Sequence, residues 1–217
     1  MHAAPDARLA RSRLRATGGA LVRLRDGRVV AIRPARPADA QAVQAFVRGL
    51  SPLARRRRFF GAVSELSPDQ LDRLTRIRDP RDASLVAIAA DAGEPCIVAM
   101  AQYATLDSPE AEVAVVVADA WQRQGLGARL LEMLLERAAA AGVQLMNGHV
   151  LAENGPMLSL ATRLGFAFAD DRDPGLVRLE RSVPPPRRAV WFAEQLRRLV
   201  ARRPAAIAAP AFAAEAR

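Results

Sequence analysis

The chain has 217 residues and a single cysteine. This length suits one well-filled core with tails and is short for two full domains, and one cysteine excludes an internal disulfide or a zinc cluster. No apolar run approaches the ~18 residues of a membrane-spanning helix, so we expect a cytoplasmic protein with no membrane partner. The net charge is +9, all from arginine, but residues 37–183 hold 16 arginines against 19 acids. They lack the basic, aromatic-interleaved stripe of a nucleic-acid-binding protein, so no nucleic-acid partner is expected.

The first third of the chain alternates strand and helix signals. Residues 1–20 are rich in arginine and alanine, as in a transit peptide, but we expect a flexible, loosely ordered basic arm. An Asp-Gly turn followed by Val29–Ile32 predicts a hairpin or a strand entry, and Pro37–Asp39 opens a helix. The run Arg55–Arg58 predicts a short helix with a solvated basic face, with contact to an acidic substrate protein as the alternative. A capping box at Ser67–Gln70 opens the next helix.

The middle of the chain predicts three strands, a glycine loop and a long helix. The predicted strands cover Leu85–Ala90, Cys96–Ala104 and Glu112–Ala118, the first two as a hairpin. After the long helix, which Gly142 ends, the remaining elements are a strand over Val143–Leu151, a helix over Asn154–Leu164, and strands over Phe166–Ala169 and Leu176–Arg181. This mixed order predicts an α/β or α+β fold with one central sheet.

The last segment, residues 184–217, begins with three prolines and is rich in arginine and alanine. Apolar residues recur in it at helical spacing, at Phe192, Leu196, Leu199 and Val200. We therefore predict an amphipathic helix in the tail, which could join two copies as a homodimer.

The loop between the valine-rich strand and the long helix has the pattern Gln122-x-x-Gly125-x-Gly127. Glycines let the backbone approach a ligand closely, and the first turn of a helix adds unpaired N–H groups and a partial positive charge. Such a loop is suited to binding a pyrophosphate. The third glycine of a dinucleotide-binding fingerprint and the lysine of a P-loop are absent, which excludes those two kinds of site.

Three segments of the chain resemble the GNAT superfamily of acyl-CoA-dependent N-acetyltransferases. They are Gln122–Ala128, Asn154–Met157 and Leu164–Phe166. The segments Ile32–Pro34 and Ala111–Asp119 resemble the acetyltransferase domain of Pat-type protein lysine acetyltransferases. The resemblance covers about residues 29–182. It implies a mixed, mostly antiparallel central sheet that is splayed between its fourth and fifth strands and flanked by helices. We expect the GNAT domain to span residues 21–183.

In Pat-type proteins this domain is often fused to a nucleotide-binding or acyl-CoA-synthetase-like partner. The chain is too short for such a fusion. We therefore expect regulation by such a domain to be absent or supplied in trans.

The resemblance also implies the ligands and the residues that hold them. Acetyl-CoA would be the co-substrate, with no metal, and a primary amine, preferably a protein lysine, would accept the acetyl group in a ternary complex. The mildly acidic middle of the chain suits a cationic acceptor. The residues implied for CoA binding are Val115, Val117, Arg123, Gln124, Gly125, Leu126, Gly127, Ala128 and Asn154.

The acids Asp170, Asp171 and Asp173 form a charged turn with too few partners for a metal.

Glu112 would be the general base by the same resemblance. Only a neutral amine attacks a thioester, yet the pKa of a free lysine is ~10.4 against ~4.3 for a free glutamate. Apolar surroundings bring two such values closer together. Glu112 has the most apolar sequence neighbours of any acid in the chain, including Ala111 and Val113. The alternative is that it begins a strand in solvent.

Two positions depart from the family pattern. Many GNAT enzymes carry a tyrosine four residues before Gly165 to protonate the leaving thiolate, but this chain has Ala161. His149 stands where Pat-type proteins have an acid, and it is either an accessory base or a half-buried strand residue without chemistry. Two alternative functions stay open: a small-molecule amine acetyltransferase and a non-catalytic acyl-CoA-sensing module. The missing tyrosine favours the sensor.

Overall fold

The computed structural model describes residues 7–61, 63–91, 94–106 and 109–185, and its strands form one sheet of order β1-β2-β3-β4-β5-β6-β8-β7. The strands are β1 Ala20–Arg23, β2 Val29–Pro34, β3 Ala83–Asp91, β4 Glu94–Thr105, β5 Glu110–Val117, β6 Leu145–Leu151, β7 Ala167–Asp170 and β8 Leu176–Ser182. Neighbouring strands are antiparallel except β5 and β6, which are parallel. The predicted mixed, mostly antiparallel sheet flanked by helices is confirmed.

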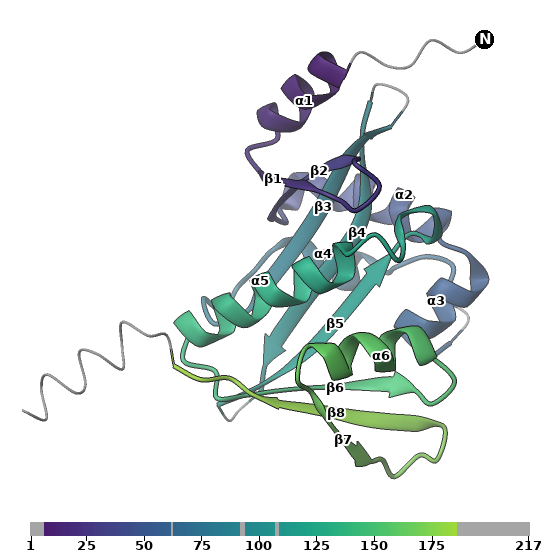
Figure 1. Ribbon diagram of the computed structural model, residues 1–217, viewed down its shortest axis with the longest axis vertical. Helices are drawn as coiled ribbons and strands as arrows, with labels where there is room; N and C mark the ends of the chain where they lie inside the picture. The colour runs from purple at the N-terminus through teal and green to yellow at the C-terminus, as the bar shows by residue number, and fades with distance from the viewer. Residues whose placement is uncertain (1–6, 62, 92–93, 107–108, 186–217) are drawn as a thin grey trace, which may run out of the picture. The chain divides into compact units, whose positions relative to one another are not determined.

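Helices cover both faces of this sheet (Figure 1). The helices are α1 Ala7–Ala16, α2 Ala40–Gly49, α3 Pro52–Phe59, α4 Pro68–Thr75, α5 Leu126–Ala140 and α6 Gly155–Arg163, with short 3-10 turns at Pro37–Asp39 and Asp119–Trp121. One apolar cluster joins α5 and α6 to the sheet, and a second joins α1, α2, α3 and α4 to the opposite face. Side chains alternate between the faces along a strand. Val113, Val115 and Val117 accordingly pack toward α5, whereas Val116 packs toward the second cluster.

The N-terminal segment differs from the expected loose arm over residues 1–20. Ala7–Ala16 form a helix, because Leu14 packs into the second cluster and is only 2% exposed. One buried leucine among arginines and alanines leaves no periodic pattern, so this contact is not visible in the sequence. The strand β1 was also not predicted separately. Because β1 precedes the first predicted strand, the fourth and fifth predicted strands are β5 and β6. The splay is therefore expected between β5 and β6.

A buried ion pair fixes the start of α2 to the end of β2. The Arg33 guanidinium donates to both carboxylate oxygens of Asp39, at 2.6 and 2.7 Å, and the Arg36 backbone N–H donates to the same carboxylate at 2.8 Å. These hydrogen bonds, those from Arg33 foremost, hold the pKa of Asp39 below its usual value. The pair anchors the helices that border one end of the site described next.

Two sequence-based expectations concern the membrane and the tail. No helix in the described ranges is both long and apolar enough to cross a bilayer. The predicted tail helix and its dimer contact, in residues 186–217, lie outside the described residues.

Candidate active site

The two parallel strands in the middle of the sheet separate after a short contact. β5 and β6 pair only at Glu110 with Leu145, Ala111 with Met146 and Glu112 with Asn147, and beyond that point they diverge (Figure 1). The splay that the sequence resemblance implied is therefore present.

Within the described part of the chain, the separation leaves one edge of β5 without a strand partner beyond Glu112. The Ala118 N–H donates to the Val98 carbonyl on β4 at 2.9 Å, and main-chain groups along an antiparallel strand face its partner at alternate residues. Val113, Val115 and Val117 thus direct their N–H and C=O groups into the gap. An extended ligand with amide groups can pair with such an edge as an added strand.

A glycine allows the strands to meet closely at the apex of the gap. A Cβ atom built on Gly148 would lie 2.9 Å from the Val113 carbonyl oxygen, closer than real contacts allow. Any side chain here would push the strands apart at the point where the unpaired edge begins. The apex therefore requires glycine.

The predicted pyrophosphate loop follows β5 and adopts two left-handed residues. Gln122 donates its side-chain N–H to the Val117 carbonyl at 3.0 Å, which folds the loop back onto the strand. Arg123 has φ 59° and Gly125 φ 88°. A non-glycine residue with positive φ is uncommon and often marks a functional turn. Gly125 is the N-cap of α5, where its conformation costs little.

The first turn of α5 offers free donors to the gap. The N–H groups of Leu126, Gly127 and Ala128 have no acceptor within the helix, and no acid lies in this turn. A Cβ on Gly127 would contact Leu160 of α6 at 3.4 Å, so glycine also keeps α5 and α6 close together. The partial positive charge of a helix N-terminus makes this turn suited to an anion.

A hairpin far away in the sequence supports this loop. The Arg25 N–H donates to the Gln124 carbonyl at 3.3 Å. The Arg28 guanidinium lies 3.8 Å from the centre of the Trp121 ring and donates to the Ala120 carbonyl at 2.9 Å. Sequence analysis missed these residues because the contacts span more than 90 positions and leave no local pattern.

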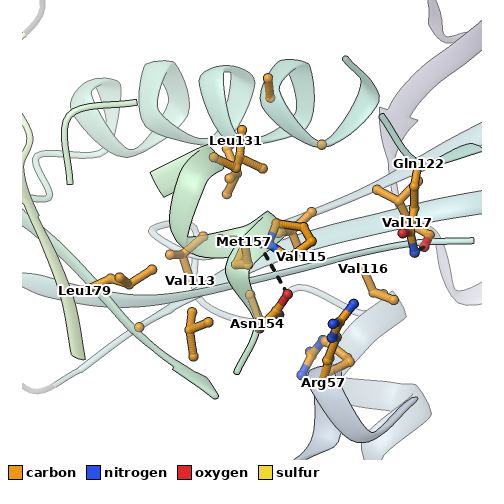
Figure 2. Close-up of a pocket in the computed structure, with 18 of the residues that line it drawn as sticks. Arg57, Val113, Val115, Val116, Val117, Gln122, Leu131, Asn154, Met157 and Leu179 are labelled. Atoms are coloured by element: carbon orange, nitrogen blue, oxygen red, sulfur yellow. Dashed lines mark hydrogen bonds between the residues drawn. The ribbon is translucent and has the colours of Figure 1, made fainter. Parts of the chain in front are cut away.

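A cavity of about 290 Å³ runs along the gap from the loop to Glu112, near the lower end of the range for small-ligand sites, roughly 300–1,000 Å³. Figure 2 shows Leu131 of α5 on one side of β5 and Arg57 of α3 on the other. Asn154 lines the cavity and is buried, and its side-chain oxygen accepts from the Met157 N–H at 3.4 Å. That bond caps α6 and fixes the amide where the cavity passes.

Glu112 lies at the inner end of this cavity in contact with a histidine. His149 Nδ1 is 3.4 Å from Glu112 Oε1, and His149 Nε2 is 3.1 Å from Asp171 Oδ2. The Asp173 N–H donates to the other Asp171 oxygen at 3.0 Å, which fixes that carboxylate. The structure therefore joins Glu112, His149 and the charged turn that carries Asp171 into one chain of polar contacts.

The environment of Glu112 differs from the expectation. Its side chain is 51% exposed, whereas its neighbours Ala111 and Val113 are buried. Neighbouring side chains of a strand point to opposite faces, so apolar neighbours in the sequence do not bury a residue between them. The side chain faces the cavity and solvent together.

The charge of the cavity also differs from that of the surrounding chain. Among the described residues that line it, five arginines accompany the single carboxylate of Glu112; the arginines are Arg25, Arg57, Arg58, Arg123 and Arg163. The expectation of a site suited to a cation through the acidity of the domain is therefore wrong for the cavity itself. Arg57 and Arg58 belong to the run expected to face solvent.

The described residues of the site include neither a metal-binding cluster nor a tyrosine. In the described ranges, no group of three or more His, Cys, Asp or Glu side chains could hold a metal. Ala161, at the position of the family tyrosine, is fully buried. The one tyrosine of the chain, Tyr103, is buried in the core, and this burial raises its pKa.

Comparisons with known proteins agree with this geometry. The profile described as "Acetyltransferase (GNAT) family" matches residues 47–166. The chain is 37% identical over 151 residues to the acetyltransferase PA5475 of Pseudomonas aeruginosa, covering 69% of this chain and 81% of that protein. It is 40% identical over 75 residues to the acetyltransferase Pat of Mycolicibacterium smegmatis, covering 35% of this chain but 22% of Pat. The crystal structure of the GNAT domain of S. lividans PAT superposes with a TM-score of 0.68 at 30% identity, covering 77% of this chain and 98% of that domain.

Proposed function

Because the chain belongs to the acetyltransferase (GNAT) family and is an acetyltransferase with acetyl-CoA as its acyl donor, we propose that it acetylates a primary amine, preferably a protein lysine, in a ternary complex. The observation that carries the proposal is the unpaired edge of β5, which leads from the loop to Glu112. A covalent enzyme intermediate is not needed, because donor and acceptor can meet at this edge. We also propose that the reaction takes place in the cytoplasm.

The donor end holds acetyl-CoA through the main chain. The N–H groups from Arg123 to Ala128, which include those of Gln124, Gly125, Leu126 and Gly127, bind the pyrophosphate, with the helix N-terminus contributing positive charge. Val115, Val117 and the fixed amide of Asn154 bind the amides of the pantetheine arm. The Val117 carbonyl already accepts from Gln122, which leaves its N–H and both groups of Val115 for the ligand. Acetyl-CoA supplies the activated acetyl group.

Glu112 removes the proton from the attacking amine, directly or through one water. Its exposure lets water reach it, and His149 supplies the next acceptor. In one tautomer of His149 the ring proton is on Nε2 and faces Asp171. The lone pair of Nδ1 then faces Glu112 and can accept the proton that Glu112 has taken from the amine. The Asp171 carboxylate, which is 15% exposed, then stabilises the charged imidazole. His149 and Asp171 thus assist Glu112 as a base, a role that the sequence analysis assigned to apolar surroundings.

The leaving thiolate takes its proton from solvent. Ala161 offers no donor and lies in the core, and the one tyrosine is buried away from the cavity. The half-exposed inner end of the cavity gives water access.

A turnover assay with acetyl-CoA, candidate proteins and small amines tests the proposal. The chain contains no lysine, so every acetyl-lysine detected comes from the acceptor. We expect Glu112→Gln to lower kcat by roughly 10²–10⁴-fold while calorimetry shows unchanged CoA binding. Glu132→Gln, which alters an exposed carboxylate on α5, serves as the matched control and retains activity.

Three results would contradict parts of the proposal. Unchanged kcat in Glu112→Gln would exclude Glu112 as the base. Tight CoA binding without turnover on any amine would identify an acyl-CoA sensor. Turnover confined to small amines would replace the protein lysine with a small-molecule acceptor.

A further inference from the structure

We propose that Arg57 and Arg58 form a carboxylate-binding subsite for the acceptor, so that the enzyme prefers amines that carry a carboxylate nearby. This inference rests on the proposed function, since it assigns a substrate class to the same cavity. The carboxylate has two possible sources, an acidic residue beside a protein lysine or the α-carboxylate of a free amino acid.

Helix α3 presents both arginines to the cavity by its periodicity. Ala54, Arg57 and Arg58 are separated by three and four residues, so they share one helix face. All three line the cavity, and Ala54 is buried against the core. Arg55 and Arg56 fall outside this face and do not line it.

The position of α3 is fixed from both ends. Ser51 Oγ accepts from the Ala54 N–H at 3.1 Å, and the same hydroxyl donates to an oxygen of Asp119 at 3.1 Å, just after β5. Phe60 ends the helix in the left-handed region, with φ 58°. The two guanidinium groups are thus held against the strand that carries Glu112.

Among the described residues, neither guanidinium group has a carboxylate within ion-pair distance, although the charge of Glu112 lies near Arg58. The Nε atom of Arg57 is buried and has no hydrogen-bond partner among the residues that the structure describes. In the described part of the chain, neither Arg57 nor Arg58 makes an ion pair, whereas Arg56 on the same helix pairs with Glu153 at 3.4 Å. Arg58 lies 4.9 Å from the centre of the Phe59 ring. Both side chains are partly buried. A buried polar atom without an acceptor is costly, and an anion that accepts from the Arg57 Nε–H removes that cost.

The two arginines share a face of β5 with the proposed base. Glu112 and Val116 lie on the same face by strand alternation, and Figure 2 shows Arg57 beside Val116. Burial lowers the pKa of Arg58, and the nearby charge of Glu112 opposes that shift. A carboxylate held here leaves an amine on the same molecule within reach of Glu112.

The phosphates of CoA have their own binding groups elsewhere. The loop backbone and Arg25, which approaches the Gly125 position to 3.7 Å, serve the opposite end of the cavity. The phosphates can therefore be bound without Arg57 and Arg58. This separation makes the acceptor the expected source of the anion.

Matched acceptors test the subsite. A lysine peptide with a neighbouring glutamate is compared with the same peptide carrying glutamine, and free lysine with its decarboxylated diamine. We expect the wild type to prefer the carboxylate-bearing member of at least one pair by roughly ten- to a hundredfold in kcat/KM, as a charge-assisted hydrogen bond implies. The pair that shows the preference identifies the source.

Five variants separate the subsite from other roles. Arg57→Gln and Arg58→Gln abolish the preference by raising the acceptor KM, with the acetyl-CoA KM unchanged, while Arg55→Gln keeps it. Arg57→Lys and Arg58→Lys retain the charge but not the forked geometry, and we expect them to keep part of the preference. Thermal unfolding of each variant checks that the domain is folded.

Four outcomes would overturn the inference. They are equal rates for both members of each pair, equal losses in the variants for charged and neutral acceptors, a raised acetyl-CoA KM, and an arginine-dependent preference for succinyl-CoA over acetyl-CoA. Turnover without a carboxylate preference refutes only the subsite. CoA binding without turnover on any amine refutes the proposed function and the subsite together.

Discussion

The two ends of the cavity are built from different parts of the chain. The end that we propose for the donor consists of main-chain N–H groups in one short loop and the first turn of α5. The end that we propose for the acceptor consists of side chains from α3, β5, β6 and the turn after β7. A site made of backbone needs glycines at fixed spacing, which a sequence displays directly. A site made of side chains from four elements depends on register and packing, which appear only in the folded chain.

The largest expected effect on stability concerns the buried ion pair between β2 and the start of α2. Asp39→Asn leaves Arg33 buried without its partner, and we expect a loss of about 3 kcal/mol in the free energy of unfolding, measured by urea denaturation. The exposed pair of Arg48 and Glu65 provides the control: Glu65→Gln costs less than about 1 kcal/mol. Equal effects for the two variants would show that burial does not distinguish the pairs.

The same carboxylate predicts a pH dependence. The pKa of Asp39 is lowered in the folded state, so its stabilising effect is present above its unfolded pKa of ~3.9 and is lost as pH falls toward the folded value. We expect the difference in stability between wild type and Asp39→Asn to be largest near neutral pH and to shrink below about pH 4. A difference that is constant with pH would contradict this origin.

A second test addresses the donor end alone. A valine at Gly125 must adopt the left-handed conformation at φ 88° and should weaken CoA binding about a hundredfold, since strain of ~1–2 kcal/mol adds to the loss of close approach. Gly142→Val is the matched control, because Gly142 has φ 81°, no neighbour within 4 Å and lies at the other end of α5. Calorimetry with CoA measures both. Equal losses would mean that the loop does not bind the ligand.

A third test concerns the histidine at the acceptor end. We expect His149→Gln and Asp171→Asn to lower kcat about tenfold with the acetyl-CoA KM unchanged, as for loss of part of a proton-transfer path. Asp170→Asn, on an exposed neighbour, should leave kcat unchanged. Combining His149→Gln with Glu112→Gln should cost no more than Glu112→Gln alone, because the two residues act in sequence. Additive losses would show that His149 acts independently.

The smallest effect concerns the hairpin that supports the loop. Arg28→Gln removes the contact with Trp121, and we expect the acetyl-CoA KM to rise two- to fivefold, as a cation–π contact of about 0.5–1 kcal/mol implies. Arg23→Gln, on the exposed side of β1, is the control. An unchanged KM for Arg28→Gln would mean that the loop holds its shape without the hairpin.

The contrast between the two ends also explains what could be predicted. Glu112 and the loop residues follow from local patterns and a family resemblance, and so does the splay beside Val115. The exposure of Glu112 was missed because apolar neighbours in a strand point away from the residue between them. His149 and Asp171 meet only because β6 and β8 pair and bring the β7–β8 turn across. Arg57 and Arg58 had a signal, the spacing of three and four from Ala54, but nothing in the sequence shows that Ala54 faces a cavity.

The supporting hairpin affects where this domain can be cut. A fragment trimmed to residues 47–166 would keep every position of the family signature. It would lose Arg28, whose guanidinium stacks on Trp121, and Asp171, which orients His149. Such a truncated protein would retain the family motif without the contacts that hold the loop and His149 in position. A fragment for expression should therefore include every strand of the sheet, from β1 to β8.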